Sequence, residues 1–228
     1  MEVGPLVGSG RDCDVFDVGP GRVVRRNRNG RNTEVEALTM THLRAHNYPV
    51  PEVFDAAGAD IVMERLDGPT MVDAFARRPW RLSTYAHQLA DLIGRLQAVP
   101  LPDHDLPQRV PPGEVLVHLD LHPLNVMLTP KGPVVIDWTG ACTGAPGLDA
   151  ANTWLTVAAG QVDATGLERA LIGVGRRALL ARLRRAVDTT QTRQQLGTAL
   201  AFRRSDPNLS DAEVATMEAI VAAKGEPC

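Results

Sequence analysis

The stretch of sequence from residue 115 to residue 138, VLVHLDLHPLNVMLTPKGPVVIDW, decides the fold that we expect of this chain. It contains two apolar runs of strand length, at Val115–Val117 and Val134–Ile136, and a turn between them at Pro130–Gly132. A carboxylate follows each run, as Asp120 and Asp137. The pattern therefore predicts two neighbouring strands that each deliver an acid at their end.

An amide completes this set of oxygen donors. Asn125 lies between the two acids, just ahead of the short apolar segment Val126–Leu128. Magnesium is a hard cation that takes few protein oxygens and shares the phosphates of a substrate. Two carboxylates and an amide on neighbouring strands and their loop therefore predict a magnesium site that binds a phosphate-bearing substrate.

The spacing within this stretch is more specific than any single residue in it. The segment HLDLHPLN, residues 118–125, matches the kinase pattern H-R-D-L-x-x-x-N at every position except the Arg, and IDW follows where kinases have D-F-G. These motifs resemble the aminoglycoside phosphotransferase and choline kinase-like family, which are small-molecule kinases of the protein-kinase fold. The resemblance implies that Asp120 is the catalytic base for an acceptor hydroxyl. It also implies that Asn125 and Asp137 hold Mg²⁺ on the phosphates of ATP or GTP.

The resemblance assigns two supporting residues as well. His118 is expected to pack and form hydrogen bonds that fix the catalytic loop. Asp149 matches the family's buried aspartate, which braces this loop from the next helix. From the local sequence alone, Asp149 is also a candidate N-cap for a helix over residues 150–159, and the two roles are compatible.

A metal-binding alternative uses the same stretch. His118, Asp120 and His122 alternate, so on a strand their side chains would share one face, as in a zinc hydrolase. The other histidines show no paired motif that would add zinc ligands. We favour the phosphotransferase interpretation because its pattern accounts for more of the residues.

A glycine-containing hairpin is predicted near the start of the chain. Leu6–Phe16 has the pattern of a strand, a turn and a strand, and Gly8, Ser9 and Gly10 would let backbone amides approach the phosphates of a nucleotide. The sequence resembles the Gly-rich loop of kinases, but the third glycine is missing. A plain hairpin turn explains this segment equally well.

The next predicted strand would carry the cation that grips the nucleotide phosphates, which is a lysine in the kinase plan. No lysine precedes Lys131, so we assign the role to Arg25, with Arg26 as the alternative because adjacent strand residues face opposite ways. The missing lysine and the minimal glycine loop leave a catalytically weak, nucleotide-binding pseudokinase as an alternative function.

An acidic partner for this cation is predicted on the helix that follows, which runs to about His46. Glu36 would pair with the strand cation in the kinase plan. Glu36 also has capping-box spacing from Thr33, which is a complete structural explanation for the same residue. We favour the pairing role, because the logic of the site outweighs a single cap.

The rest of the chain predicts the overall architecture. Backbone groups from Glu64 to Leu66 would bind the adenine edge at an interlobe hinge, and helical periodicity dominates beyond Pro69. Later helices are expected over 167–187, 194–204 and 211–224. We therefore predict an α+β, two-lobed protein-kinase-like fold, with a β-rich nucleotide-binding lobe over residues 1–66 and a mainly helical, acceptor-binding lobe over residues 67–228.

Composition limits the partners. The net charge of −3 gives no general attraction to nucleic acid or to an anionic membrane, so we expect neither, and instead a small hydroxylated molecule as acceptor. No apolar run is long enough for a membrane span and the first residues do not resemble a signal peptide. Cys13, Cys142 and Cys228 have no pairing logic, which favours a reducing cytoplasm. A monomer and a homodimer are equally compatible with the sequence.

Overall fold

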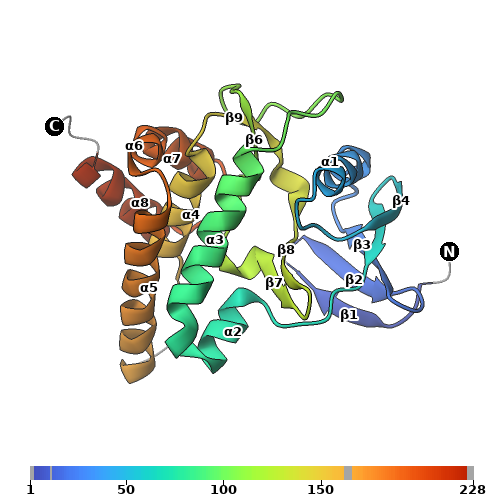
Figure 1. The fold of residues 1–228 in the computed structure, drawn as a ribbon, viewed down its shortest axis with the longest axis horizontal. Helices are drawn as coiled ribbons and strands as arrows, with labels where there is room; N and C mark the ends of the chain where they lie inside the picture. Colours follow the sequence, from blue (N-terminus) through green and yellow to red (C-terminus); the bar gives the residue numbers. More distant parts are fainter. Residues whose placement is uncertain (1–2, 11, 162–165, 225–228) are drawn as a thin grey trace.

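The structure is a computed structural model that describes residues 3–10, 12–161 and 166–224. An antiparallel sheet with one helix forms the N-terminal part, and a mainly helical part follows it (Figure 1). The predicted α+β class is therefore confirmed. The exact boundary between residues 66 and 67 stays a prediction.

The N-terminal sheet has five strands in the order β1-β2-β3-β5-β4. These are β1 (Leu6–Ser9), β2 (Cys13–Asp17), β3 (Arg22–Asn27), β4 (Val53–Ala57) and β5 (Asp60–Glu64). Gly8 on β1 is paired with Val15 on β2, which in turn is paired with Arg25 on β3. The predicted hairpin therefore forms, and its register places the first glycine in line with the candidate phosphate-binding arginine.

One helix, α1 (Glu34–Ala45), packs beside this sheet (Figure 1). Met40 and Leu43 are buried in the core, so the predicted helix is held by its apolar face. The predicted capping box is wrong, because the hydroxyl of Thr33 donates to the carbonyls of Gly58 (3.2 Å) and Asp60 (2.8 Å) instead of capping the helix. Tertiary contacts with the β4–β5 turn thus replace the local cap, and Glu36 is left for another role.

The C-terminal part consists of helices around two small strand pairs, β6 with β9 and β7 with β8. Its elements are α2 (Met71–Arg77), α3 (Leu82–Gln97), β6 (Val115–Val117), β7 (Val126–Thr129), β8 (Gly132–Val135), β9 (Cys142–Gly144), α4 (Leu148–Ala159), α5 (Gly166–Ala186), α6 (Thr189–Gln194), α7 (Leu196–Arg204) and α8 (Asp211–Lys224). Short 3₁₀ turns cover Pro79–Arg81, Pro123–Asn125 and Trp138–Gly140.

One predicted helix is wrong in extent. The sequence predicts a single helix over 194–204, but the structure has α6 and α7 in succession. Asp188 caps α6 by accepting hydrogen bonds from the backbone N–H groups of Thr190 (2.8 Å) and Gln191 (3.0 Å). The segment TTQTRQ has no apolar periodicity, so the cap is its only local helix signal.

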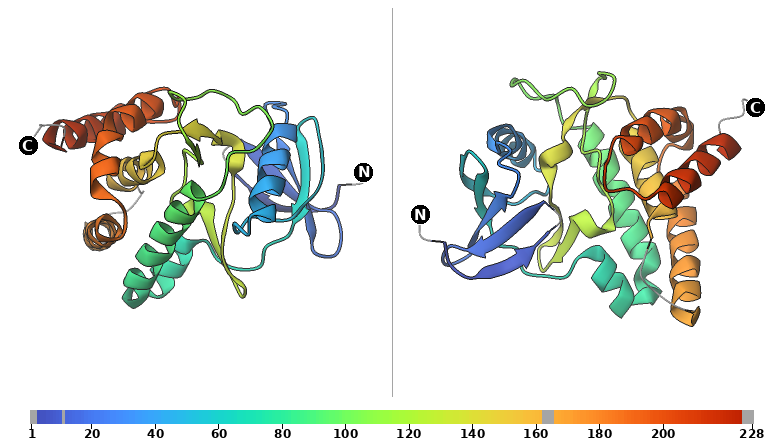
Figure 2. Two further views of the ribbon diagram at one scale, coloured as in Figure 1. Left: turned by 45° about the horizontal axis from the view of Figure 1, so that its top comes forward. Right: turned by 180° about the vertical axis from the view of Figure 1, so that it is seen from behind.

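Two apolar clusters meet at the catalytic stretch. One cluster extends from α1 and the sheet to α3, while the other lies among α4, α7 and α8. Leu116 of β6 belongs to the first cluster and its neighbour Val117 to the second, because successive strand residues face opposite ways. The views in Figure 2 show β6 and β9 between the sheet and the C-terminal helices. The catalytic loop therefore starts from a strand that is buried on both faces.

Two observations bear on the expectations from composition. Among the described residues, no helix is both long and apolar enough to cross a bilayer. Cys13 and Cys142 are free thiols, and Cys228 lies outside the described residues.

Candidate functional site

Asp149, in the first turn of α4, contacts the backbone of the predicted catalytic loop at residues 118–125. The carboxylate of Asp149 accepts hydrogen bonds from the backbone N–H groups of His118 (2.9 Å) and Leu119 (2.8 Å). The N-cap position belongs to Gly147, so the N-cap alternative for Asp149 is wrong. Burial raises the pKa of Asp149, although the two backbone N–H groups and His118 oppose this shift. The geometry is that of a brace on the loop.

His118 is a fully buried part of the loop. Its Nδ1 accepts a hydrogen bond from the backbone N–H of Asp120 (3.1 Å), so Nε2 carries the proton that is donated to the carbonyl of Ile136 (3.1 Å). The ring also packs against Trp138, with 4.5 Å between the centroids. Because both nitrogens are in use, His118 has no lone pair for a metal. No group of three or more His, Cys, Asp and Glu side chains in the described chain is arranged to bind one, which removes the geometric basis of the zinc hypothesis.

Asp120 and Asn125 are in direct contact. The amide nitrogen of Asn125 donates to the backbone carbonyl (2.9 Å) and to Oδ2 (3.0 Å) of Asp120, which leaves the amide oxygen of Asn125 for another ligand. The carboxylate of Asp120 also contacts His122 Nε2 at 3.3 Å and the guanidinium of Arg203. Burial by itself raises the pKa of Asp120, but the hydrogen bond from His122 and the charge of Arg203 outweigh it, and the pKa lies well below its ordinary value.

Asp137 faces the sheet. It has a left-handed backbone conformation with a φ of 63°, and its Oδ1 accepts a hydrogen bond from the hydroxyl of Thr139 (2.8 Å). Arg25 Nη1 lies 3.6 Å from the same oxygen, and Asp137 is partly exposed. The structure therefore brings one of the two motif acids to the arginine of β3.

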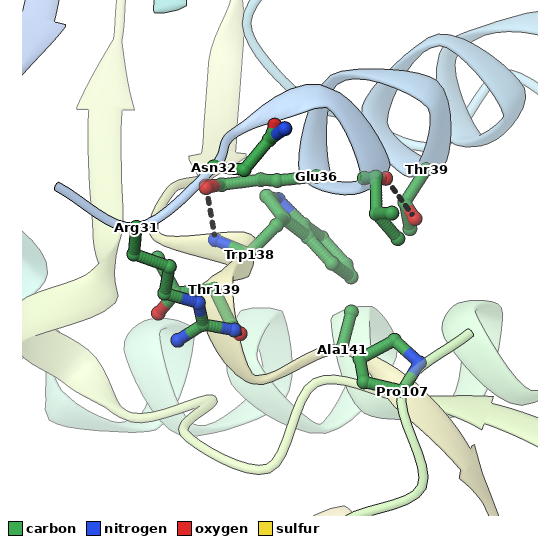
Figure 3. A pocket seen from close by; sticks show the side chains of 9 residues that line it. Arg31, Asn32, Glu36, Thr39, Pro107, Trp138, Thr139 and Ala141 are labelled. Atoms are coloured by element: carbon green, nitrogen blue, oxygen red, sulfur yellow. Dashed lines mark hydrogen bonds between the residues drawn. The ribbon is translucent and has the colours of Figure 1, made fainter. Parts of the chain in front are cut away.

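Glu36 connects this arginine to the catalytic stretch. Glu36 Oε2 forms an ion pair with Arg25, and Oε1 accepts a hydrogen bond from the backbone N–H of Trp138 at 3.2 Å (Figure 3). Both charged side chains are more than 90% buried. The α1 acid is thus bound both to the sheet cation and to the residue that follows Asp137.

The alternative arginine lies elsewhere. Arg26 faces solvent and forms a two-pronged ion pair with Asp60, through Nε at 2.7 Å and Nη2 at 2.6 Å. Strand alternation accounts for the difference, since Arg25 and Arg26 are adjacent on β3. Of the two candidates, the structure brings Arg25 to the other site residues and does not bring Arg26.

The glycine hairpin lies on the same sheet but is loosely packed. A Cβ atom at Gly8 would meet only Val15, at an ordinary 3.7 Å, and at Gly10 it would meet Cys13 Sγ at 3.3 Å. The hydroxyl of Ser9 donates to Asp14 at 2.9 Å. Neither glycine has a positive φ, so the fold itself does not require glycine here.

The predicted hinge follows β5. Glu64 ends the strand and its carboxylate accepts from the backbone N–H of Glu52 (3.3 Å), while Leu66 is half-buried just beyond it. Gly68 is packed so closely that a Cβ atom would lie 2.2 Å from the carbonyl of Leu128. The backbone N–H of Leu128 donates to Pro69 at 2.9 Å, so the hinge is bound to β7.

A small hollow lies behind Glu36 (Figure 3). It is lined by residues of α1 and of the segment just before it, of the turn after Asp137, and of the loop between α3 and β6, namely Arg31, Asn32, Val35, Glu36, Thr39, Pro107, Trp138, Thr139 and Ala141. Its volume of about 30 Å³ is far too small for a nucleotide. We therefore assign it no part in substrate binding.

Three residues that contact the loop were missed in the sequence analysis. Asn152 donates to the carbonyl of Leu119, Thr153 donates to that of Leu121, and Arg203 of α7 contacts Asp120. Asn152 and Thr153 follow Asp149 by three and four residues, so all three share one face of α4. The sequence offered one signal for Asn152 and Thr153, namely polar residues three and four positions after Asp149 in the otherwise apolar segment LDAANTWL. Arg203 had no such signal, because its partner is remote in sequence.

Comparison with known proteins gives a family-model match over part of the chain and a shared fold. Residues 103–186 match the model of the phosphotransferase enzyme family. No curated protein matches the chain. An ethanolamine kinase from Plasmodium vivax is similar in structure, with a TM-score of 0.57 at 11% identity over 96% of this chain and 81% of that one.

Two further structures are similar. A choline/ethanolamine kinase family protein from Mesorhizobium loti has a TM-score of 0.55 at 16% identity, over 98% of this chain and 89% of that one. The ADP-bound aminoglycoside phosphotransferase APH(2'')-Ib has a TM-score of 0.56 at 13% identity, over 97% and 93%. The predicted resemblance is confirmed: the chain carries the phosphotransferase enzyme family match over residues 103–186 and has the two-lobed protein-kinase-like fold of these enzymes.

Proposed function

We propose that this protein is a small-molecule kinase that transfers the γ-phosphoryl group of ATP or GTP to a hydroxyl group of its acceptor. The observation that carries the proposal is a continuous set of contacts between the two parts of the site. Arg25 contacts Glu36 and Asp137, and Glu36 contacts Trp138. The backbone N–H of Ile136, the residue before Asp137, donates to the carbonyl of Asn125 at 3.0 Å, and the amide of Asn125 contacts Asp120. Phosphoryl transfer depends mostly on positioning and on charge stabilisation, which such a set of fixed charges supplies.

The donor set fits a magnesium ion. Asn125 uses its amide nitrogen on Asp120, so its oxygen remains available, and Asp137 is a partly exposed carboxylate. These are hard oxygen donors of the kind that Mg²⁺ takes together with substrate phosphates. When bound, the ion would neutralise charge on the phosphates.

Each residue then has a stated role. Arg25, which is oriented by Glu36, would bind nucleotide phosphates, and the backbone of Gly8–Gly10 would cover them. Asp120 would take the proton of the acceptor hydroxyl while the hydroxyl oxygen bonds to the γ-phosphorus. The bond from that phosphorus to the bridging oxygen breaks, and the nucleoside diphosphate leaves. His118 and Asp149 would hold the loop in place.

The similar structures suggest a broad class of acceptor but not one compound. The similar structures include kinases of ethanolamine and a phosphotransferase of aminoglycosides, which carry hydroxyl groups. We therefore propose a hydroxylated small molecule as the acceptor, with amino alcohols, sugars and aminoglycosides as the first compounds to test.

The test is nucleotide consumption with Mg²⁺ across a panel of hydroxylated amines and sugars. We expect at least one acceptor to stimulate consumption by the wild type, and Asp120→Asn to lower kcat by about 10²- to 10⁴-fold while nucleotide binding is retained. Nucleotide binding with no turnover for any acceptor would contradict the proposal and favour the pseudokinase alternative. Absence of nucleotide binding would contradict both.

A further inference from the structure

Arg203 is a buried arginine that three groups of the catalytic machinery share. Its Nε donates to Asn152 Oδ1 at 2.9 Å, and its Nη2 donates to the carbonyl of Leu119 at 3.4 Å and to Oδ1 of Asp120. It lies on α7, outside the residues that match the family model. A distant helix therefore reaches the candidate base through one side chain.

The carboxylate of Asp120 is held on both of its oxygens. Arg203 binds Oδ1, while the amide of Asn125 binds Oδ2 at 3.0 Å. A rotation of the carboxylate would break the ion pair with Arg203 on one side and the hydrogen bond from the Asn125 amide on the other. The pair of contacts thus selects one orientation of the group that would receive the acceptor proton.

The backbone that carries this carboxylate is held by the same residues. Leu119 has a φ of 65°, in the left-handed region that a leucine rarely adopts. Asp149 binds its N–H, and Asn152 and Arg203 bind its C=O. Such strain persists only where the surroundings over-determine the conformation. Arg203 therefore acts on the backbone before Asp120 as well as on its side chain.

We infer that Arg203 is a positioning residue for phosphoryl transfer, which orients the carboxylate of Asp120 toward the acceptor oxygen. The inference rests on the proposed function. A purely structural ion pair would stabilise the protein without a specific effect on turnover. A positioning residue would instead lower kcat when it is removed and leave nucleotide affinity unchanged.

The test compares three variants in the full-length protein. Arg203→Met removes the guanidinium, and Arg203→Lys keeps the charge but cannot bridge Asn152 and Asp120. Arg204→Met is the matched control, since Arg204 is the next residue and pairs with the exposed Glu218. The measurements are formation of ADP from ATP with Mg²⁺, with water or an identified hydroxyl compound as the phosphoryl acceptor, the KM for ATP, and thermal unfolding.

We expect Arg203→Met to lower kcat about 100-fold with the KM for ATP within about twofold of the wild type, Arg203→Lys to recover part of the loss, and Arg204→Met to behave as the wild type. A folded Arg203→Met with wild-type kcat would overturn the inference alone, as would equal losses in kcat and in ATP affinity. If Arg203→Met does not fold, a folded Arg203→Lys with wild-type kcat overturns it, and one with a reduced kcat and unchanged KM supports it. A wild type without any turnover would overturn the proposed function and this inference together.

Discussion

Two segments of the candidate site, the loop at residues 118–125 and the glycine hairpin, differ in how firmly they are held. The catalytic loop is tied to α4 and α7 by buried side chains, among which His118, Asp149 and Asn152 are almost fully enclosed. The glycine hairpin has largely exposed residues along β1, and a Cβ atom at Gly8 would meet Val15 at an ordinary distance, although one at Gly10 would meet Cys13 Sγ more closely. Under the proposed function, this difference would leave the catalytic loop assembled in advance and the glycine hairpin free to adjust to a nucleotide.

The largest effect is expected from the Arg25–Glu36 pair, which joins the sheet to the residue after Asp137. Arg25→Met leaves Glu36 buried without its cation, so we expect the free energy of unfolding to fall by about 3–5 kcal/mol. Arg26→Met is the matched control, because its pair with Asp60 is solvent-exposed and we expect a much smaller loss of stability. Urea denaturation of both variants measures the two free energies of unfolding. Equal losses of stability would contradict the assignment of Arg25 as the buried partner and Arg26 as the exposed one.

The brace on the catalytic loop comes next. Asp149→Asn replaces an acceptor of two backbone N–H groups by an amide that can face them with a donor, and we expect about 1–3 kcal/mol of destabilisation. Turnover should fall as well, because Leu119 would no longer be held. Thermal unfolding and steady-state kinetics test this, and a variant that is both stable and active would show that the loop does not need the brace.

In the glycine hairpin we expect a substitution to change nucleotide binding and to leave stability nearly unchanged. Gly8→Ala adds a Cβ at an ordinary distance from Val15, so we expect stability within about 0.5 kcal/mol of the wild type but a raised KM for nucleotide. Gly68→Ala is the contrasting variant, since its Cβ would clash with Leu128 and φ is 147°. If Gly8→Ala leaves the nucleotide KM unchanged, the hairpin is a plain turn.

The smallest expected effect is a difference in alkylation rate between the two described thiols, Cys13 and Cys142. Cys142 is fully buried and its pKa is raised to about 12 by burial, so it should not react with iodoacetamide at pH 8 in the folded protein. Cys13 lies partly exposed on the hairpin and should be alkylated slowly, and more slowly when ATP is present. Mass spectrometry of the labelled peptides decides, and equal labelling of both thiols would contradict the difference in packing.

The sequence predicted those parts of the site whose residues lie close together along the chain. The segment from Asp120 to Asp137 has a motif with fixed spacing, and the fold class follows from it. Strand alternation alone could not decide whether Arg25 or Arg26 is the phosphate-binding cation. It shows that the two side chains face opposite ways but not which of them is buried. The role of Glu36 also could not be decided from the sequence, because its spacing from Thr33 fits a capping box. In the structure Thr33 binds carbonyls of the β4–β5 turn instead, which rules the capping box out.

Contacts between distant segments could not be predicted from the sequence. Arg203 reaches Asp120 across 83 positions of the chain, and no local pattern encodes such a meeting. The same applies to Asn152, whose carbonyl partner on Leu119 lies in another element. These residues make their contribution through packing of α4 against α7, which depends on the complete fold.

The attachment of the hinge to β7 has a mechanical consequence. Gly68 abuts Leu128 without space for a side chain, and Pro69 accepts the hydrogen bond of that same strand residue. The strand begins at Val126, directly after Asn125. The segment that leaves the sheet is therefore fixed to the strand that starts directly after Asn125, so that a displacement of one would be transmitted to the other.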